Sequence, residues 1–213
     1  MYYLSRVPLD SRNRNVMKAL ANPRRIHGAV ESSFPGGRKR RLWRIDLLHG
    51  RLYLLILSED LPELATLEQQ FSGEGEKGII KPLDAYLSSI HAGERFRFRL
   101  AANPSKALIQ ERERGKVVAN ITPAYQRQWI LDRATVHGFS VEEETFDIIE
   151  SRWVQFYKPD PQAGKSRNVR FLMTVYEGIL QVTDEEAFLR TLVQGMGREK
   201  AYGCGLLTVM RIG

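Results

Sequence analysis

The chain has 213 residues, of which 43% are apolar, so it can bury the core of one compact unit or of two small domains. Lysine and arginine outnumber aspartate and glutamate by 32 to 25, which favours a polyanionic partner such as a nucleic acid or an acidic membrane surface. The single cysteine, Cys204, excludes an internal disulfide and a multi-cysteine zinc site. We expect neither a membrane-spanning run nor a signal peptide, and therefore a cytoplasmic protein. The four histidines have no HxxxH or HExxH spacing, so we expect no metal, and we expect no cofactor.

The first elements are a strand and two consecutive helices. The apolar opening at residues 1–9 predicts a strand, and residues 16–21 predict a short helix. Asn22 and Pro23 are the residue types of a helix N-cap and a first helical position. A second helix should therefore start there and run to about Ser33.

A hairpin, a helix and a further strand follow. Two apolar runs meet at His49-Gly50, a dipeptide that favours a tight turn between antiparallel strands. Residues 62–71 have the pattern of a short amphipathic helix, and residues 95–100 alternate strictly between basic and apolar. The first half therefore reads strand, helix, strand, strand, helix, strand.

The second half repeats the end of this order. A helix is expected over 123–138, and two apolar runs within 169–184 are predicted to form a hairpin that turns at Glu177-Gly178. A helix at 185–196 and a strand at 202–210 follow.

Two ferredoxin-like βαββαβ units explain this repeated order with short connections, so the predicted class is α+β. We assign residues 1–95 to an N-terminal domain, 96–120 to a strand and linker, and 121–213 to a C-terminal domain. The polar segment 158–168 is expected to be an exposed loop that interrupts a long hairpin.

Basic side chains form a row on the strand at 95–100. Arg95, Arg97 and Arg99 should share one face, at a spacing that suits a phosphate backbone. The alternative is a half-buried strand whose solvent face is basic. Basic clusters at 36–44, 110–116 and 165–170 add to a field that favours RNA or DNA.

A glycine-rich segment runs from a predicted helix to a predicted strand. This direction is the reverse of a Rossmann loop, and the spacing does not fit the GxxxxGK[ST] loop. The backbone there could approach a phosphate closely, beside Arg198 and Lys200. A tight chain reversal is the alternative. The glycines are Gly195, Gly197, Gly203 and Gly205.

His27 lies on the polar border of the helix that Pro23 starts. Ile26, Val30 and Phe34 form the apolar stripe, and His27 is about 100° from it, beside Arg24. The nearby helix N-terminus attracts phosphate, and an imidazole can exchange a proton near neutral pH. His27 could deprotonate a ribose 2′-OH or protonate a leaving 5′ oxygen. A surface histidine without a catalytic role is the alternative.

Segments along nearly the whole chain resemble the CasE family of CRISPR repeat-processing endoribonucleases, which belong to the RAMP superfamily. These segments are MYYLSRV, ANPRRIH, RFRLAANPSK, YEGILQV and GMGREKAYGCGLLTV, in that order. The resemblance implies two tandem ferredoxin-like (RRM-like) domains. It also implies metal-independent cleavage at the base of a CRISPR repeat stem-loop, which leaves a 2′,3′-cyclic phosphate and a 5′-OH. The enzyme would then stay on the 3′ hairpin as a Cascade subunit. The alternative is a subunit that holds an RNA hairpin without cutting it.

The resemblance also assigns roles to residues. His27 occupies the position of the family's catalytic histidine, and Lys165 is placed near the scissile phosphate. Arg24 stands where family members carry a tyrosine; an arginine cannot exchange a proton but can stabilise the charge of a phosphorane. The expected RNA-binding residues are Arg25, Arg38, Lys39, Arg40, Arg97, Arg99, Lys106, Arg167, Arg170, Arg198 and Lys200, together with the glycine-rich segment.

Overall fold

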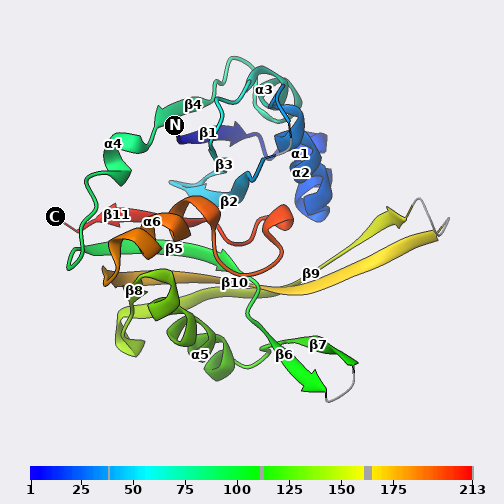
Figure 1. Ribbon diagram of the computed structural model, residues 1–213. Helices are drawn as coiled ribbons and strands as arrows, with labels where there is room; N and C mark the ends of the chain where they lie inside the picture. Colours follow the sequence, from blue (N-terminus) through cyan, green and yellow to red (C-terminus); the bar gives the residue numbers. More distant parts are fainter. Residues whose placement is uncertain (38, 111–112, 161–164, 213) are drawn as a thin grey trace.

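The structure is a computed structural model that describes residues 1–37, 39–110, 113–160 and 165–212. Figure 1 shows two main sheets, one above the other in this view, with a long hairpin that reaches away from the body on the right. Both chain ends lie on the opposite side from this hairpin. Within the described ranges, no helix is both long enough and apolar enough to cross a bilayer.

The first sheet is antiparallel, with the strand order β2-β3-β1-β4. Its two inner strands present Val7, Leu54 and Ile56 to the helices, where Ile26 and Phe71 complete a buried core. The strands are β1 (Tyr3–Leu9), β2 (Leu42–Leu48), β3 (Arg51–Ser58) and β4 (Ile79–Pro82), and the helices are α1 (Arg14–Ala21), α2 (Pro23–Ser32) and α3 (Ala65–Phe71).

The second sheet has the order β11-β5-β10-β8, and β9 also pairs with β10. Phe96, Phe98 and Tyr176 face α5 and α6, where Trp129 and Phe188 close the larger core. The strands are β5 (Arg95–Ala102), β8 (Phe139–Ser140), β9 (Phe146–Asp160), β10 (Lys165–Val182) and β11 (Leu207–Arg211), and the helices are α5 (Pro123–Ala134) and α6 (Glu185–Gln194).

Smaller elements join and flank the two sheets. A short helix lies between them in the sequence, and a separate two-stranded ribbon follows β5. These elements are α4 (Asp84–Leu87), β6 (Ser105–Gln110), β7 (Glu113–Ala119) and the 3₁₀ turns η1 (Thr135–His137), η2 (Glu143–Thr145) and η3 (Lys200–Tyr202). The chain thus has the predicted α+β architecture of two tandem ferredoxin-like domains. The boundaries expected for these domains stay a prediction.

Two local predictions are confirmed closely. The Asn22 side chain accepts a hydrogen bond from the Arg24 N–H at 3.2 Å, and α2 begins at Pro23. The turn between β2 and β3 lies at His49-Gly50, with φ of 50° and 77°. Both signals depend only on neighbouring residues, which is why they could be read without knowledge of tertiary contacts.

The strand at 95–102 lies in the second sheet, so the prediction that it closes the first unit is wrong. β5 pairs with β10 and β11, because its apolar face completes the core beneath α5 and α6. The first sheet is completed instead by β4, which pairs with β1 from Tyr3↔Pro82 to Arg6↔Ile79. β5 is therefore an inner strand with a buried apolar face and a basic outer face, as the alternative interpretation of its arginine row expects.

The predicted hairpin at Glu177-Gly178 is also wrong, because β10 runs through both residues as one strand. Gly178 lies against β9: a Cβ at this position would be 2.3 Å from the Thr145 carbonyl oxygen. The glycine thus permits a close approach of two strands rather than a turn. The expected loop at 158–168 is likewise strand where it is described, since Lys158 pairs with Arg167 in the ladder of β9 and β10.

Candidate active site

Helix α2 places Arg24 and His27 one turn apart, and therefore on neighbouring parts of one helix face. Ile26 and Val30 are buried against the first sheet, as the sequence pattern predicts. His27 is half-buried, whereas Arg24 and the adjacent Arg25 are exposed. The helix thus fixes the depth of the imidazole and leaves guanidinium groups at the surface beside it.

The glycine-rich segment connects α6 to β11 and packs against α2 and β2 through η3. Helix α6 ends at Gln194, two residues before the predicted end, and Gly195 is its C-cap residue. The four glycines have φ of 68°, 79°, 87° and 92° along the chain, a left-handed region that favours glycine. At Gly203 a Cβ would lie 2.9 Å from the Trp43 ring, so the segment lies close against β2.

Tyr202, at the end of η3, joins this segment to His27 and to the long hairpin. The centroids of the Tyr202 and His27 rings are 6.5 Å apart, and the ring planes meet at 74°. On its other side Tyr202 packs edge-on against Phe156 of β9, at a centroid distance of 4.8 Å, and stacks near Phe171 of β10 at 6.1 Å. Helix, glycine-rich segment and hairpin therefore meet at one tyrosine.

Charged groups surround this tyrosine. Burial raises the pKa of Tyr202 and the carboxylate of Glu199 adds to the rise, while the positive charges of Arg24 and Arg167 act in the opposite direction. Burial also raises the pKa of Glu199, against the positive charges of Arg198 and Arg167. Arg24, Arg167 and Arg198, which the sequence singled out separately, thus act electrostatically on one small region beside His27.

Lys200 is held by the end of α6. Its Nζ donates hydrogen bonds to the carbonyl oxygens of Gln194 (2.9 Å) and Gly195 (2.7 Å), a favourable place for a cation at a helix C-terminus. Burial, with the nearby charge of Arg40, lowers the pKa of Lys200 to about 8. Arg40 donates to the same Gln194 carbonyl at 3.4 Å. Lys200 and Arg40 therefore lie together at the C-terminal end of α6.

The hairpin presents its arginines on opposite faces. Arg167 pairs with Lys158 and shares a face with Phe156 and Phe171, which contact Tyr202. Arg170 lies on the other face, with its guanidinium 4.2 Å from the centre of the Trp153 ring. Lys165 begins β10, but its side chain lies outside the described part of the structure, and so does the whole of Arg38.

The remaining candidates lie outside α2, the glycine-rich segment and the hairpin. Lys39 forms an ion pair with Asp60 at 2.8 Å, and the ammonium of Lys106 lies 5.1 Å from the centre of the Tyr125 ring. Arg97 is exposed on β5, and Arg99 on the same face forms ion pairs with Asp46 and Glu177. The arginine row is therefore partly neutralised by carboxylates of β2, in the first sheet, and of the adjacent strand β10.

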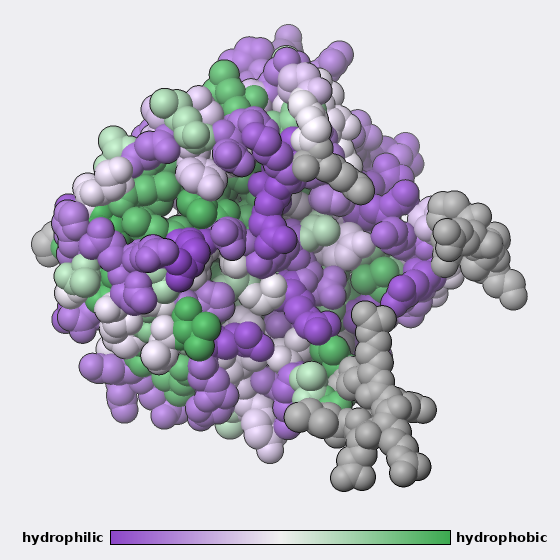
Figure 2. All heavy atoms as spheres, in the orientation of Figure 1, coloured by the Kyte–Doolittle hydropathy of each residue, from purple (hydrophilic) through white to green (hydrophobic). Residues whose placement is uncertain are grey.

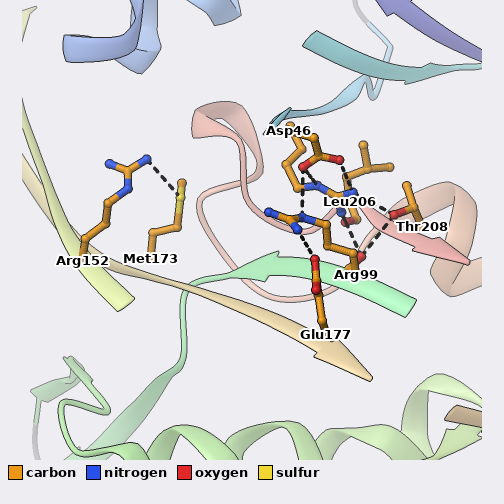
Figure 3. Close-up of polar contacts among 8 residues, drawn as sticks. Asp46, Arg99, Arg152, Met173, Glu177, Leu206 and Thr208 are labelled. Atoms are coloured by element: carbon orange, nitrogen blue, oxygen red, sulfur yellow. Dashed lines mark hydrogen bonds and ion pairs between the residues drawn. The ribbon is translucent and has the colours of Figure 1, made fainter. Parts of the chain in front are cut away.

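A buried ion-pair network joins the two sheets near Arg99 (Figure 3). Arg44 of β2 binds both oxygens of Asp46 at 2.7 Å, and its NH1 donates to the carbonyl oxygens of Arg99 and Leu206 at 2.8 Å. Its NH2 also donates to Thr208 Oγ1 at 2.8 Å. The basic cluster 36–44 therefore contributes a structural cation between the domains, besides the surface cations that the sequence suggested.

Tyr202 and Glu199 were not predicted from the sequence as parts of this site. The detectable signal was an aromatic and an acidic residue inside a glycine-rich, basic segment, but their contacts come from elements far away in the sequence. Figure 2 shows that hydrophilic residues cover most of the face around the base of the hairpin. In the part of the chain that the structure describes, no cluster of three histidine, cysteine or acidic side chains could hold a metal ion.

Comparison with known proteins supplies the family. A family model described as "CRISPR associated protein" matches residues 2–211. The chain is 32% identical to the CRISPR-associated endoribonuclease Cse3 of Thermus thermophilus, over 97% of this chain and 99% of that protein. It is 30% identical to the CRISPR system Cascade subunit CasE of Escherichia coli K12, over 56% of this chain and 60% of that protein.

Solved structures agree with this assignment. The structure of CRISPR endoribonuclease Cse3 bound to a 19-nucleotide RNA superimposes with a TM-score of 0.81, at 28% identity, and covers 98% of both chains. Thermus thermophilus Cse3 bound to an RNA that represents a pre-cleavage complex gives a TM-score of 0.78, at 29% identity, again over 98% of both chains. The chain therefore belongs to the family of CRISPR-associated proteins that includes Cse3 and CasE.

Proposed function

We propose that this protein is a metal-independent endoribonuclease that cleaves CRISPR precursor RNA at the base of the repeat stem-loop. It then stays bound to the 3′ hairpin of the guide RNA as a subunit of a Cascade complex. The relatives support this function, because an endoribonuclease matches the chain over nearly its full length and a Cascade subunit matches more than half of it. The lone cysteine fits a reducing compartment, and we propose that the protein acts in the cytoplasm.

One observation carries the catalytic part of the proposal: the His27 ring contacts Tyr202, on which positive charges of both α2 and the hairpin act. Arg24 is one turn from His27, and Arg167 acts on Tyr202, whose ring contacts the imidazole. A phosphodiester between these cations would lie beside a group that exchanges protons near neutral pH. The arrangement thus offers a proton-transfer group and charge stabilisation in one place.

The chemistry needs two proton movements. The ribose 2′-OH loses its proton as its oxygen bonds to the adjacent phosphorus, and the bond from phosphorus to the 5′ oxygen breaks as that oxygen gains a proton. His27 would perform one of these transfers. Arg24 and Arg167 would stabilise the additional negative charge of the phosphorane without exchanging protons. Lys165 is proposed to act near the same phosphate, and the other surface cations of the set to bind the RNA backbone.

The test uses purified protein, its cognate repeat RNA and excess EDTA. We expect one cut per repeat, with a 2′,3′-cyclic phosphate on the upstream product and a 5′-OH on the downstream product. A substrate with a 2′-deoxyribose at the cut nucleotide should bind but remain intact, because it lacks the nucleophile. Binding of the unmodified RNA without any cut would instead support the alternative, a subunit that holds the RNA hairpin but does not cleave it.

A further inference from the structure

Tyr202 connects His27 to other parts of the proposed RNA site. Its ring meets the His27 imidazole at 74°, with centroids 6.5 Å apart, an arrangement in which the edge of one aromatic ring approaches the face of the other. Phe156 and Phe171 hold Tyr202 from the hairpin side, and both are buried. The tyrosine therefore has little freedom to turn away from the histidine.

The backbone of the glycine-rich segment fixes where Tyr202 lies. Glu199 adopts a left-handed conformation with φ of 57°, and its carbonyl accepts hydrogen bonds from the N–H groups of Tyr202 (2.9 Å) and Cys204 (3.4 Å). Gly203 follows with φ of 87° and lies against the Trp43 ring. A non-glycine residue in this conformation is strained, and such strain persists where surrounding contacts impose it. The turn thus holds the Tyr202 ring in a fixed position beside His27.

The polar end of Tyr202 lies in a charged environment. The charges of Glu199, Arg24 and Arg167 all act on its hydroxyl group, and these residues come from η3's N-terminal side, from α2 and from β10. RNA that binds Arg24 and Arg167 would therefore also surround Tyr202. The ring is connected at one side to the helix that carries His27 and at the other to the hairpin that carries Arg167.

We propose that Tyr202 is a positioning residue for RNA cleavage: its ring holds the His27 imidazole in one orientation and couples that orientation to the placement of the β9–β10 hairpin. This inference rests on the proposed function, in which His27 transfers a proton at the cut phosphodiester. Proton transfer depends steeply on the position of the imidazole. Loss of the ring should therefore slow the chemical step more than it weakens RNA binding.

The experiment compares Tyr202→Leu, Tyr202→Phe and wild-type protein in single-turnover cleavage. Tyr202→Leu removes the ring contact and should lower the cleavage rate about tenfold or more. Its dissociation constant for repeat RNA should stay within about twofold of wild type. Tyr202→Phe keeps the ring and should restore the rate. Tyr53→Leu, at a half-buried tyrosine of β3 that contacts Arg6, is the matched control and should cut normally.

A spectroscopic measurement tests the same contact without cleavage. In wild-type protein, NMR should detect cross-relaxation between ring protons of His27 and Tyr202, and Tyr202→Leu should displace the His27 ring-proton resonances while Tyr202→Phe largely preserves them. If wild-type protein does not cut repeat RNA, the proposed function fails, and this measurement still tests the ring contact. The wild-type spectrum alone tests the ring contact if Tyr202→Leu does not fold.

Several results would overturn the inference. An unchanged cleavage rate in folded Tyr202→Leu would do so, as would a loss of rate matched by an equal loss of RNA affinity. An equal defect in Tyr202→Phe would assign the effect to the hydroxyl group and contradict positioning by the ring. Absence of the cross-relaxation in wild-type protein would remove the contact on which the proposal stands.

Discussion

The guanidinium of Arg44 and the carboxylate of Asp46 form a two-point ion pair in the buried interface between the two sheets. Both nitrogen–oxygen distances are 2.7 Å, and the side chains are 4% and 2% exposed. Because Arg44 also donates to carbonyl oxygens of β5 and of the segment before β11, this pair attaches the first sheet to the second (Figure 3). The relative placement of His27 and the hairpin depends on that attachment.

Removal of one charge from this pair should destabilise the protein strongly. We expect Asp46→Asn to lower the free energy of unfolding by about 3–5 kcal/mol, because Arg44 would keep a buried, uncompensated charge. Urea unfolding followed by circular dichroism measures the effect. Asp60→Asn is the control, since Asp60 pairs with Lys39 at the surface and its loss should change stability little. Equal effects of the two substitutions would contradict a structural role for the buried pair.

The close approach of Gly203 to Trp43 leads to a second prediction. Gly203→Ala adds a methyl group 2.9 Å from the Trp43 ring, at a φ of 87°. It should lower both stability and cleavage, because the glycine-rich segment must move away from β2 and takes Tyr202 with it. Gly75→Ala has a similar φ of 74° but open space around the added Cβ. This control should cost only about 1–2 kcal/mol of backbone strain and leave cleavage unchanged.

Equal losses of cleavage in the two glycine variants, after correction for the fraction folded, would show that the contact with Trp43 does not position the segment. Single-turnover rates and thermal unfolding of both variants supply the comparison.

His137 should make stability depend on pH. Burial lowers the pKa of His137, and the charges of Arg133 and Lys200 add to the effect, while its Nδ1 lies 2.8 Å from Thr191 Oγ1. The unfolded chain therefore binds a proton at a higher pH than the folded protein does. Because the unfolded state then holds more protons, the free energy of unfolding should fall as the pH drops below about 6.5.

Urea unfolding between about pH 5 and pH 7.5 measures this dependence. His137→Gln cannot take up the proton, so its free energy of unfolding should vary less over the same interval. A slope in His137→Gln as steep as in wild type would assign the pH dependence to other groups.

Arg167 should contribute one phosphate contact to RNA binding. In a His27→Ala background, which keeps the RNA intact, Arg167→Ala should reduce the slope of log affinity against log salt concentration by about 0.7–0.9. Arg190 is exposed on α6 and pairs with Glu186, so Arg190→Ala should leave the slope unchanged. Filter-binding titrations at several salt concentrations provide the slopes. The same slope in Arg167→Ala and its parent would exclude this phosphate contact.

Helix caps, turn dipeptides and apolar periodicity depend on residues close together in the sequence, and they allowed a large part of the fold to be predicted. His49-Gly50 and Gly178 show the limit of such signals. The first dipeptide forms a turn with both φ values positive, whereas Gly178 lies within a strand and makes room for the Thr145 carbonyl, which immediately precedes β9. Both read as a possible turn in the sequence, and only the packing of β9 against β10 separates them.

The charged residues of the site could be predicted from the sequence, but the contacts that bring them together could not. Arg24, His27 and Arg167 stand out from residue type and resemblance, yet the sequence does not indicate that Tyr202 joins them, because η3, α2 and β10 are far apart along the chain. Arg44 was grouped with surface cations, although Asp46, two residues later on the same strand face, could have indicated a local ion pair. The further partners of Arg44 come from β5 and β11, which only the tertiary fold brings together.

The most direct measurement is single-turnover cleavage of cognate repeat RNA in EDTA by wild-type and His27→Ala protein, with RNA affinity measured in parallel. Wild-type protein should make one cut per repeat with a 2′,3′-cyclic phosphate end. His27→Ala should lose about 100- to 10,000-fold in rate while it still binds the RNA. Cleavage at the wild-type rate by His27→Ala would contradict a proton-transfer role for His27, because the group that transfers the proton would then lie elsewhere.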